Sequence, residues 1–220
     1  MIENVYKKRK HILSFDETII PDKNLINSLL KKTWKLTPSK NQFMSYTVNV
    51  IGPEHKSYKK SIYDICTMNE SDTNNNNKII DKPRFNENLM CLLNAPYTLI
   101  FTNRYEDKPN KEQSYLISRG VYYEAADKDN FEKNMTTNLI EVGMFSKILT
   151  GLCLENNLDV SYTKCFKSDY REWQKTMPFI RTSPLLIMTI GKGKKAKKPK
   201  TYKGEVTDLR PDFERIVEWI

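Results

Sequence analysis

The sequence has few of the residues from which metal centres and disulfide frameworks are built. Only four of its 220 residues are cysteine and two are histidine, and no C-x-x-C pair occurs. The wide cysteine spacing argues against a zinc site and against a disulfide framework. We therefore expect no metal, and we expect reduced, mostly buried thiols at Cys66, Cys91, Cys153 and Cys165.

Glycine-rich nucleotide motifs and long apolar runs are also absent. Neither G-x-G-x-x-G nor G-x-x-x-x-G-K-[ST] occurs, which excludes a dinucleotide-binding Rossmann fingerprint and a Walker loop. No apolar run approaches the ~18 to 20 residues of a membrane span, and the first residues lack the apolar core of a signal peptide. We expect a cytoplasmic protein with no membrane segment. No Ser-His-Asp or Cys-His arrangement offers a nucleophile.

The composition favours one folded domain over residues 1–220. A chain of this length buries one substantial core, and 39% of its residues are hydrophobic. The asparagine-rich stretch within 69–82 is the one low-complexity segment, and we expect a mobile surface loop there.

The positive charge is concentrated in one place. The formal net charge is +9, and the segment 192–203 has seven lysines and no acid, so 9 − 7 leaves +2 for the rest. A protein that binds nucleic acid usually spreads its cations over a face and interleaves stacking groups. The pattern thus argues against a nucleic-acid partner and favours a lysine-rich connector between structured segments.

Apolar periodicity predicts helices interleaved with single strands. A helix is expected after Asp22, its N-cap, and a second one after Pro53. The longest helix is expected within 135–157, where a wide apolar face indicates burial in the middle of the fold. The remaining expected elements are strands at 46–52, 97–103, 158–166 and 184–191, short helices near 86–95 and 170–175, loop with some helix over 104–134, and an amphipathic helix at 208–220. This order indicates the α+β or α/β class.

Five segments form an ordered set of motifs between about residues 7 and 205. They are RKHILSFD (9–16), TPSKNQFMSYTVNVIG (37–52), NENLMCLLNAPYTLIF (86–101), GLCLENNLDVSYTKCF (151–166) and PLLIMTIGKGKK (184–195). Together they resemble the nitroreductase family of FMN-dependent oxidoreductases. The resemblance implies a three-layer α-β-α fold of the α+β class, with a small mixed or antiparallel sheet and a long buried central helix.

The resemblance also implies a clamp for the FMN phosphate. Arg9 and Lys10 from the start of the chain would meet Lys198 and Lys200 from its end. Family members carry a K-x-R pattern in the C-terminal one of these two segments. Here that pattern corresponds to residues 198–200, where lysine replaces the arginine. His11 lies where the family most often has a serine that donates to the flavin or its phosphate.

Other residues would lie along the flavin ring. The resemblance places Asn88 at the polar edge of the ring and Glu141 beside it, with either Asn41 or Gln42 as the amide of the proline-serine loop. The segment 161–165 would follow the ring: it includes Thr163 and Cys165, and the backbone N–H of Lys164 would face flavin N5.

Three departures from the family pattern stand out. Leu13 and Cys91 lie where relatives carry cations, and Lys164-Cys165 replaces an acid-glycine pair. Lost cations near the ring would make the flavin harder to reduce.

The implied activity is hydride transfer from NAD(P)H through FMN to a quinone, nitroaromatic or other conjugated acceptor, by a ping-pong mechanism in a homodimer. The helix at 208–220 is a candidate for exchange between subunits. The alternatives are a non-catalytic flavin-binding or basic interaction module and, on charge alone, a nucleic-acid-binding domain.

Overall fold

The computed structural model describes residues 2–39, 44, 46–67, 85–104, 114–115, 118–120, 131–164, 166, 170–197, 201–202, 205–206 and 216–217. The expected loop at 69–82 and most of the expected helix at 208–220 lie outside these residues. In chain order the elements are α1 (Ile2–Lys7), β1 (Ile12–Phe15), α2 (Lys23–Leu36), β2 (Tyr46–Ile51), α3 (Lys56–Thr67), the 3-10 helix η2 (Glu87–Leu89), α4 (Cys91–Asn94), β3 (Tyr97–Asn103), α6 (Phe131–Glu155), β4 (Asp159–Thr163), α7 (Tyr170–Thr176), β5 (Pro184–Gly191), β6 (Gly193–Ala196), β7 (Thr201–Tyr202) and β8 (Glu205–Val206).

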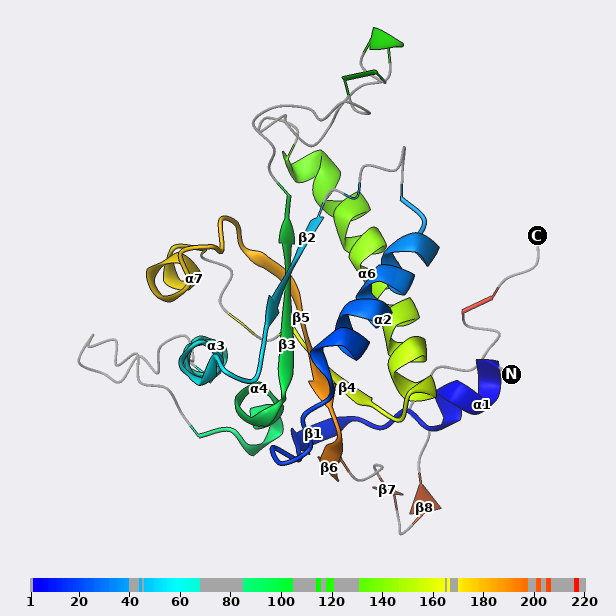
Figure 1. Cartoon of the computed structure of the whole chain (residues 1–220), viewed down its shortest axis with the longest axis vertical. Coiled ribbons are helices and arrows are strands. Elements are labelled where there is room, and N and C mark those ends of the chain that lie inside the picture. The colour runs from blue at the N-terminus through cyan, green and yellow to red at the C-terminus, as the bar shows by residue number, and fades with distance from the viewer. Residues whose placement is uncertain are drawn as a thin grey trace.

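A four-stranded antiparallel sheet forms the middle layer, with the strand order β2-β3-β5-β4. Helices α2 and α6 cover one face, and α3, α4 and α7 cover the other (Figure 1). Two hydrophobic clusters fill the spaces between these layers. The expected α+β class and three-layer arrangement are confirmed, and the sheet is antiparallel.

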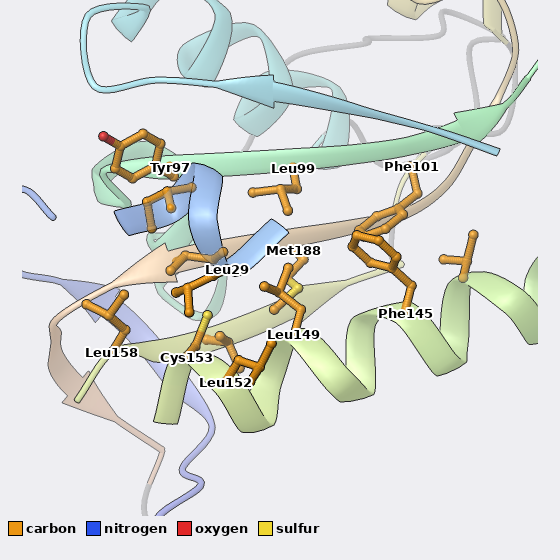
Figure 2. Close-up of a cluster of buried hydrophobic side chains, with 14 of the residues drawn as sticks. Leu29, Tyr97, Leu99, Phe101, Phe145, Leu149, Leu152, Cys153, Leu158 and Met188 are labelled. Carbon is orange, nitrogen blue, oxygen red and sulfur yellow. The ribbon is translucent and has the colours of Figure 1, made fainter. Parts of the chain in front are cut away.

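The central helix α6 has an apolar face wide enough to serve as the core of one layer. Phe145, Leu149 and Cys153 recur at helical spacing, and all three are buried. Their side chains point at those of the sheet, where Phe101 and Met188 lie opposite (Figure 2). The segment Thr136–Glu155 is long and apolar enough to cross a membrane by length and composition, but here it packs into the core.

Local signals explain where the other elements begin and end. The Asp22 carboxylate accepts the Asn24 backbone N–H at 2.6 Å, which caps α2 as the sequence predicts. Strand β3 is buried along its full length because it lies between β2 and β5, in agreement with its nearly continuous apolar run. Among the described cysteines, Cys91 and Cys153 are buried and Cys66 is partly buried, and none of the three forms a disulfide.

The N-terminal segment and the lysine run form a second, two-stranded sheet. Strand β1 pairs antiparallel with β6, and Ile12 lies opposite Ala196. The pairing continues on both sides, since the Lys197 N–H donates to the His11 carbonyl at 2.7 Å and the Asp16 N–H donates to the Lys192 carbonyl at 2.8 Å. The first part of the expected connector is therefore a strand.

A lysine is buried between α3 and the sheet. The Lys59 side chain is 3% exposed, and its Nζ donates to the Pro96 carbonyl at 2.9 Å. Burial lowers the pKa of Lys59 from the ordinary 10.5 to about 8, against the opposing effect of Glu54 and Glu17. At pH values above 8 the folded protein thus holds this amine increasingly in its neutral form.

We expect Lys59 to make the protein more stable as the pH rises from about 8 to 10.5. In this window the unfolded chain binds a proton that the folded protein has released, so the free energy of unfolding increases with pH, by at most about 1.4 kcal/mol per pH unit. Urea unfolding at several pH values should show a shallower rise for Lys59→Met. Lys60→Met, which alters an exposed lysine, is the control. Equal slopes in the wild type and Lys59→Met would contradict the expectation.

Candidate functional site

The β1–β6 pair brings basic groups from the two ends of the described chain together. Arg9 and His11 precede β1, and Lys197 follows β6. All three side chains lie at the surface, and the His11–Lys197 backbone hydrogen bond holds the two segments next to each other. We call these three residues the basic cluster. Lys10 is exposed beside it.

Arg9 lies over an aromatic ring. Its guanidinium carbon is 5.6 Å from the centroid of the Tyr162 ring, within the range of a cation–π contact. The Tyr162 hydroxyl donates to the Ser146 carbonyl at 3.0 Å and shares a short hydrogen bond with the Thr150 hydroxyl. Within the described part of the chain, no carboxylate forms an ion pair with Arg9. Among the described residues, the guanidinium N–H groups thus have no carboxylate partner.

The other two members of the basic cluster change the pKa of His11. Partial burial of the ring lowers the pKa of His11, and the positive charges of Lys197 and Arg9 lower it further. Each effect disfavours the imidazolium form. We expect His11 to be neutral at pH 7, with one ring N–H to donate.

A dianion bound at the basic cluster should raise the pKa of His11, because it offsets the positive charges of Arg9 and Lys197. The sequence has two histidines, so the His11 imidazole signal in a proton NMR spectrum can be identified by its loss in His11→Gln. In the protein alone this signal should titrate below pH 6.5, and with a saturating dianion such as inorganic phosphate it should titrate at a higher pH. An unchanged midpoint would show that the phosphate lies elsewhere.

Helix α1 packs on the C-terminal half of α6 (Figure 1). The Tyr6 hydroxyl donates to the Lys147 carbonyl at 2.8 Å, and the Lys147 ammonium lies 3.6 Å from the centroid of the Tyr6 ring. Gly151 makes this close approach possible, because a Cβ there would come within 3.0 Å of the Tyr6 hydroxyl oxygen. These contacts fix Tyr6, which lies three residues before Arg9, on α6.

The segment expected along a flavin ring begins at the edge of the main sheet. Strand β4 pairs only with β5 among the described strands. Thr163 is buried at its end, and Lys164 is exposed immediately after it. Tyr162 precedes these two residues, so the basic cluster and this segment are adjacent along β4. Cys165 lies outside the described residues.

Glu141 lies in a separate environment. Its carboxylate is 3% exposed and accepts the Ser39 hydroxyl, with 3.0 Å to each oxygen. The Ser39 oxygen in turn accepts the Met44 N–H at 2.8 Å. Burial and the Glu141 charge raise the pKa of Tyr46. A hollow of about 330 Å³ opens beside this group, lined by Trp34, Lys35, Thr37, Ser39 and Met44. Thr150 follows Glu141 by nine positions on α6, which corresponds to ~13.5 Å along the helix axis.

Asn88 lies in a third place, on η2. Its side chain is exposed, and its backbone N–H donates to the Asn86 side-chain oxygen at 3.0 Å. Helix η2 packs against β1, and a hollow of about 390 Å³ between them is lined by residues that include Leu13, Phe85, Met90 and Lys195.

Two of the departures noted in the sequence are core residues. Leu13 is 7% exposed and Cys91 is 2% exposed, and burial raises the pKa of the Cys91 thiol. Neither residue supplies a cation to the site. Like Cys165, four more of the expected site residues, Asn41, Gln42, Lys198 and Lys200, lie outside the described residues.

Sequence reasoning missed three residues of this region. Lys197 was hidden within the lysine run, where Lys198 and Lys200 matched the family pattern. Tyr6 precedes the first motif, and Tyr162 lies within the motif 151–166, where the resemblance assigned no role to its side chain. The signal that could have found Tyr162 is the alternation of β4, which places Tyr162 on the opposite face from the buried Ser161 and Thr163.

No protein-family model matches the sequence, and no curated protein matches it. Solved structures match it over nearly the full length of both chains. A nitroreductase-like protein from Streptococcus mutans has a TM-score of 0.66 at 16% identity and covers 99% of this chain and 97% of its own.

Two further structures give similar values. A proposed NAD(P)H:FMN oxidoreductase from Staphylococcus epidermidis has a TM-score of 0.68 at 15% identity, with 100% and 96% covered. A proposed nitroreductase from Exiguobacterium sibiricum, solved in complex with FMN, has a TM-score of 0.67 at 14% identity, with 100% and 97% covered. With the arrangement of layers described above, these similarities show that the protein has the nitroreductase-like fold.

Proposed function

We propose that the protein is an FMN-dependent oxidoreductase. It would pass a hydride from NAD(P)H through FMN to a quinone, nitroaromatic or other conjugated acceptor by a ping-pong mechanism, in a cytoplasmic homodimer with an exchanged C-terminal segment. The observation that carries the proposal is the basic cluster, located in a fold shared with an FMN-bound structure.

The donor set of the basic cluster fits a phosphate dianion. Arg9 offers a planar fork of N–H groups, Lys197 offers a point charge, and neutral His11 offers one N–H. Among the described residues no acid forms an ion pair with Arg9 or Lys197. We propose that Lys10, Lys198 and Lys200 complete this clamp.

The flavin ring would extend from the clamp along Thr163, Lys164 and Cys165. When bound, FMN supplies the hydride chemistry, because its N5 takes a hydride from one substrate and gives it to the next. The backbone N–H of Lys164 would donate at N5. The assignment of Asn88, Glu141 and Asn41 or Gln42 to polar contacts around the ring stays a prediction, because Asn88 and Glu141 lie in places separate from this segment. No side chain needs to act as a nucleophile.

A second candidate function is flavin binding without turnover. The observation that favours passive binding is that Leu13 and Cys91, both buried, are uncharged. Neither position therefore supplies a cation that would favour the reduced, anionic flavin. The two functions differ in whether a pyridine nucleotide reduces the bound flavin.

The test is the visible spectrum of the purified protein, recorded before and after anaerobic addition of NADH or NADPH. An oxidoreductase should show a flavin band near ~450 nm that bleaches with at least one of the two nucleotides. A band that persists with both would favour passive binding. A protein that stays colourless after incubation with excess FMN would contradict flavin binding altogether.

A further inference from the structure

We propose that Tyr162 is a positioning residue that holds the Arg9 guanidinium ready for an anionic phosphate, with α1 setting the position of Arg9 through Tyr6. The proposal rests on the proposed binding of FMN and concerns how the clamp is organised before any ligand arrives.

The Arg9 side chain is exposed, so in water it would sample many rotamers, and binding a phosphate would cost it that freedom. The Tyr162 ring, 5.6 Å from the guanidinium carbon, attracts the cation and restricts it. The ring face has no competing hydrogen-bond acceptor, so the contact leaves the N–H groups of Arg9 free to donate to a phosphate.

The Tyr162 ring is itself fixed. Its hydroxyl is bonded to two groups one turn apart on α6, the Ser146 carbonyl and the Thr150 hydroxyl. The Thr150 hydroxyl oxygen is also 2.7 Å from the Ser146 carbonyl oxygen, so three close oxygens share two hydroxyl protons. A ring that is half-buried and anchored at its far end provides a rigid surface against the central helix of the fold.

The backbone of Arg9 is fixed by hydrogen bonds to the last turn of α1. Its N–H donates to the Tyr6 carbonyl at 3.0 Å, and the Lys8 N–H donates to the Val5 carbonyl at 3.2 Å. Tyr6 packs onto α6 at Lys147, next to Ser146, and at Gly151, next to Thr150. Tyr6 and Tyr162 therefore both fix the position of Arg9 relative to the same stretch of α6, residues 146–151.

A positioning role predicts an effect that depends on the phosphate. Tyr162→Leu removes the ring and should weaken FMN binding by the flavin-free protein about two- to fivefold, measured by quenching of flavin fluorescence. Tyr162→Phe keeps the ring and should show a smaller loss. Riboflavin has the same ring system without the phosphate, so its affinity should be unchanged in both variants.

Coupling to Arg9 distinguishes positioning from a general loss of structure. In the Arg9→Met background, Tyr162→Leu should have no further effect on FMN affinity, since the group that it positions is gone. Equal weakening of FMN and riboflavin, or additive effects of the two substitutions, would overturn the proposal. If Tyr162→Leu fails to fold, the same comparisons with Tyr162→Phe and Tyr6→Phe decide it, since each removes one anchoring hydroxyl.

The outcome for the wild type separates this proposal from the proposed function. A wild type that binds neither FMN nor riboflavin would contradict the proposed function alone. The positioning role would then be decided with inorganic phosphate, by the shift that it causes in the His11 imidazole signal. That shift should be reduced in Tyr162→Leu, and an equal shift in the wild type and the variant would overturn the role.

Discussion

Replacing Arg9 with methionine is expected to weaken FMN binding about 10- to 100-fold. A hydrogen bond to a charged group contributes about 1.5–3 kcal/mol, and about 1.4 kcal/mol corresponds to a tenfold change in affinity. Arg9 is available for such bonds, because its guanidinium lies over the Tyr162 ring and no described carboxylate pairs with it. Fluorescence titration of the flavin-free variant with FMN measures the loss.

Two variants test whether the effect belongs to the arginine itself. Lys8→Met removes the same charge from the neighbouring exposed position and should change the affinity little at physiological salt. Arg9→Lys keeps the charge without the planar fork and should give an intermediate loss. Similar losses in Lys8→Met and Arg9→Met would indicate that the segment acts only through its total charge.

Replacing Phe101 with alanine should reduce the free energy of unfolding by about 3–5 kcal/mol, the range for removal of a buried aromatic side chain. Phe101 is 0% exposed at the centre of the sheet. Its ring lies against that of Phe145 on α6 (Figure 2), with the centroids 5.7 Å apart in an edge-to-face arrangement. The centroid of the Tyr46 ring on β2 is 6.4 Å away. The substitution thus opens a cavity where three elements meet. Urea unfolding of the flavin-free protein measures the change.

Phe85→Ala is the matched control for this substitution, because the Phe85 side chain is 78% exposed. It should change the free energy of unfolding by no more than about 0.5 kcal/mol. A loss of less than about 1 kcal/mol in Phe101→Ala would mean that the layers between β3 and α6 repack around the missing ring.

The parts of the fold that the sequence predicted are those with a local cause. The Asp22 cap and the apolar spacing of α2 depend on neighbours within a few residues, and the continuous apolar run of β3 follows from burial on both faces. Helix α6 has the same kind of signal, although it begins at Phe131, earlier than its apolar pattern indicates. Periodicity in these segments reports directly on the core.

The parts that the sequence did not predict depend on contacts between distant residues. Strand β6 contains two lysines in four residues, a composition that is depleted in strands, and it forms because β1 offers it a partner. Helix α1 is only six residues long and depends on the Tyr6 contact with α6. The same limit applies to the site, because no local pattern shows that Arg9 meets Tyr162.

The pairing of β1 with β6 also sets the point during synthesis at which the basic cluster can assemble. A ribosome synthesises the chain from the N-terminus to the C-terminus, so Arg9 and His11 leave it long before Lys197 does. The hydrogen bond between His11 and Lys197 therefore cannot form until almost the entire described chain has been made. The last strand of the main sheet, β5, ends at Gly191. All residues of that sheet are therefore synthesised before Ala196, the residue that pairs with Ile12. A nascent chain therefore has a complete central sheet before it has a complete basic cluster, and we expect cofactor capture to follow the assembly of the core rather than to guide it.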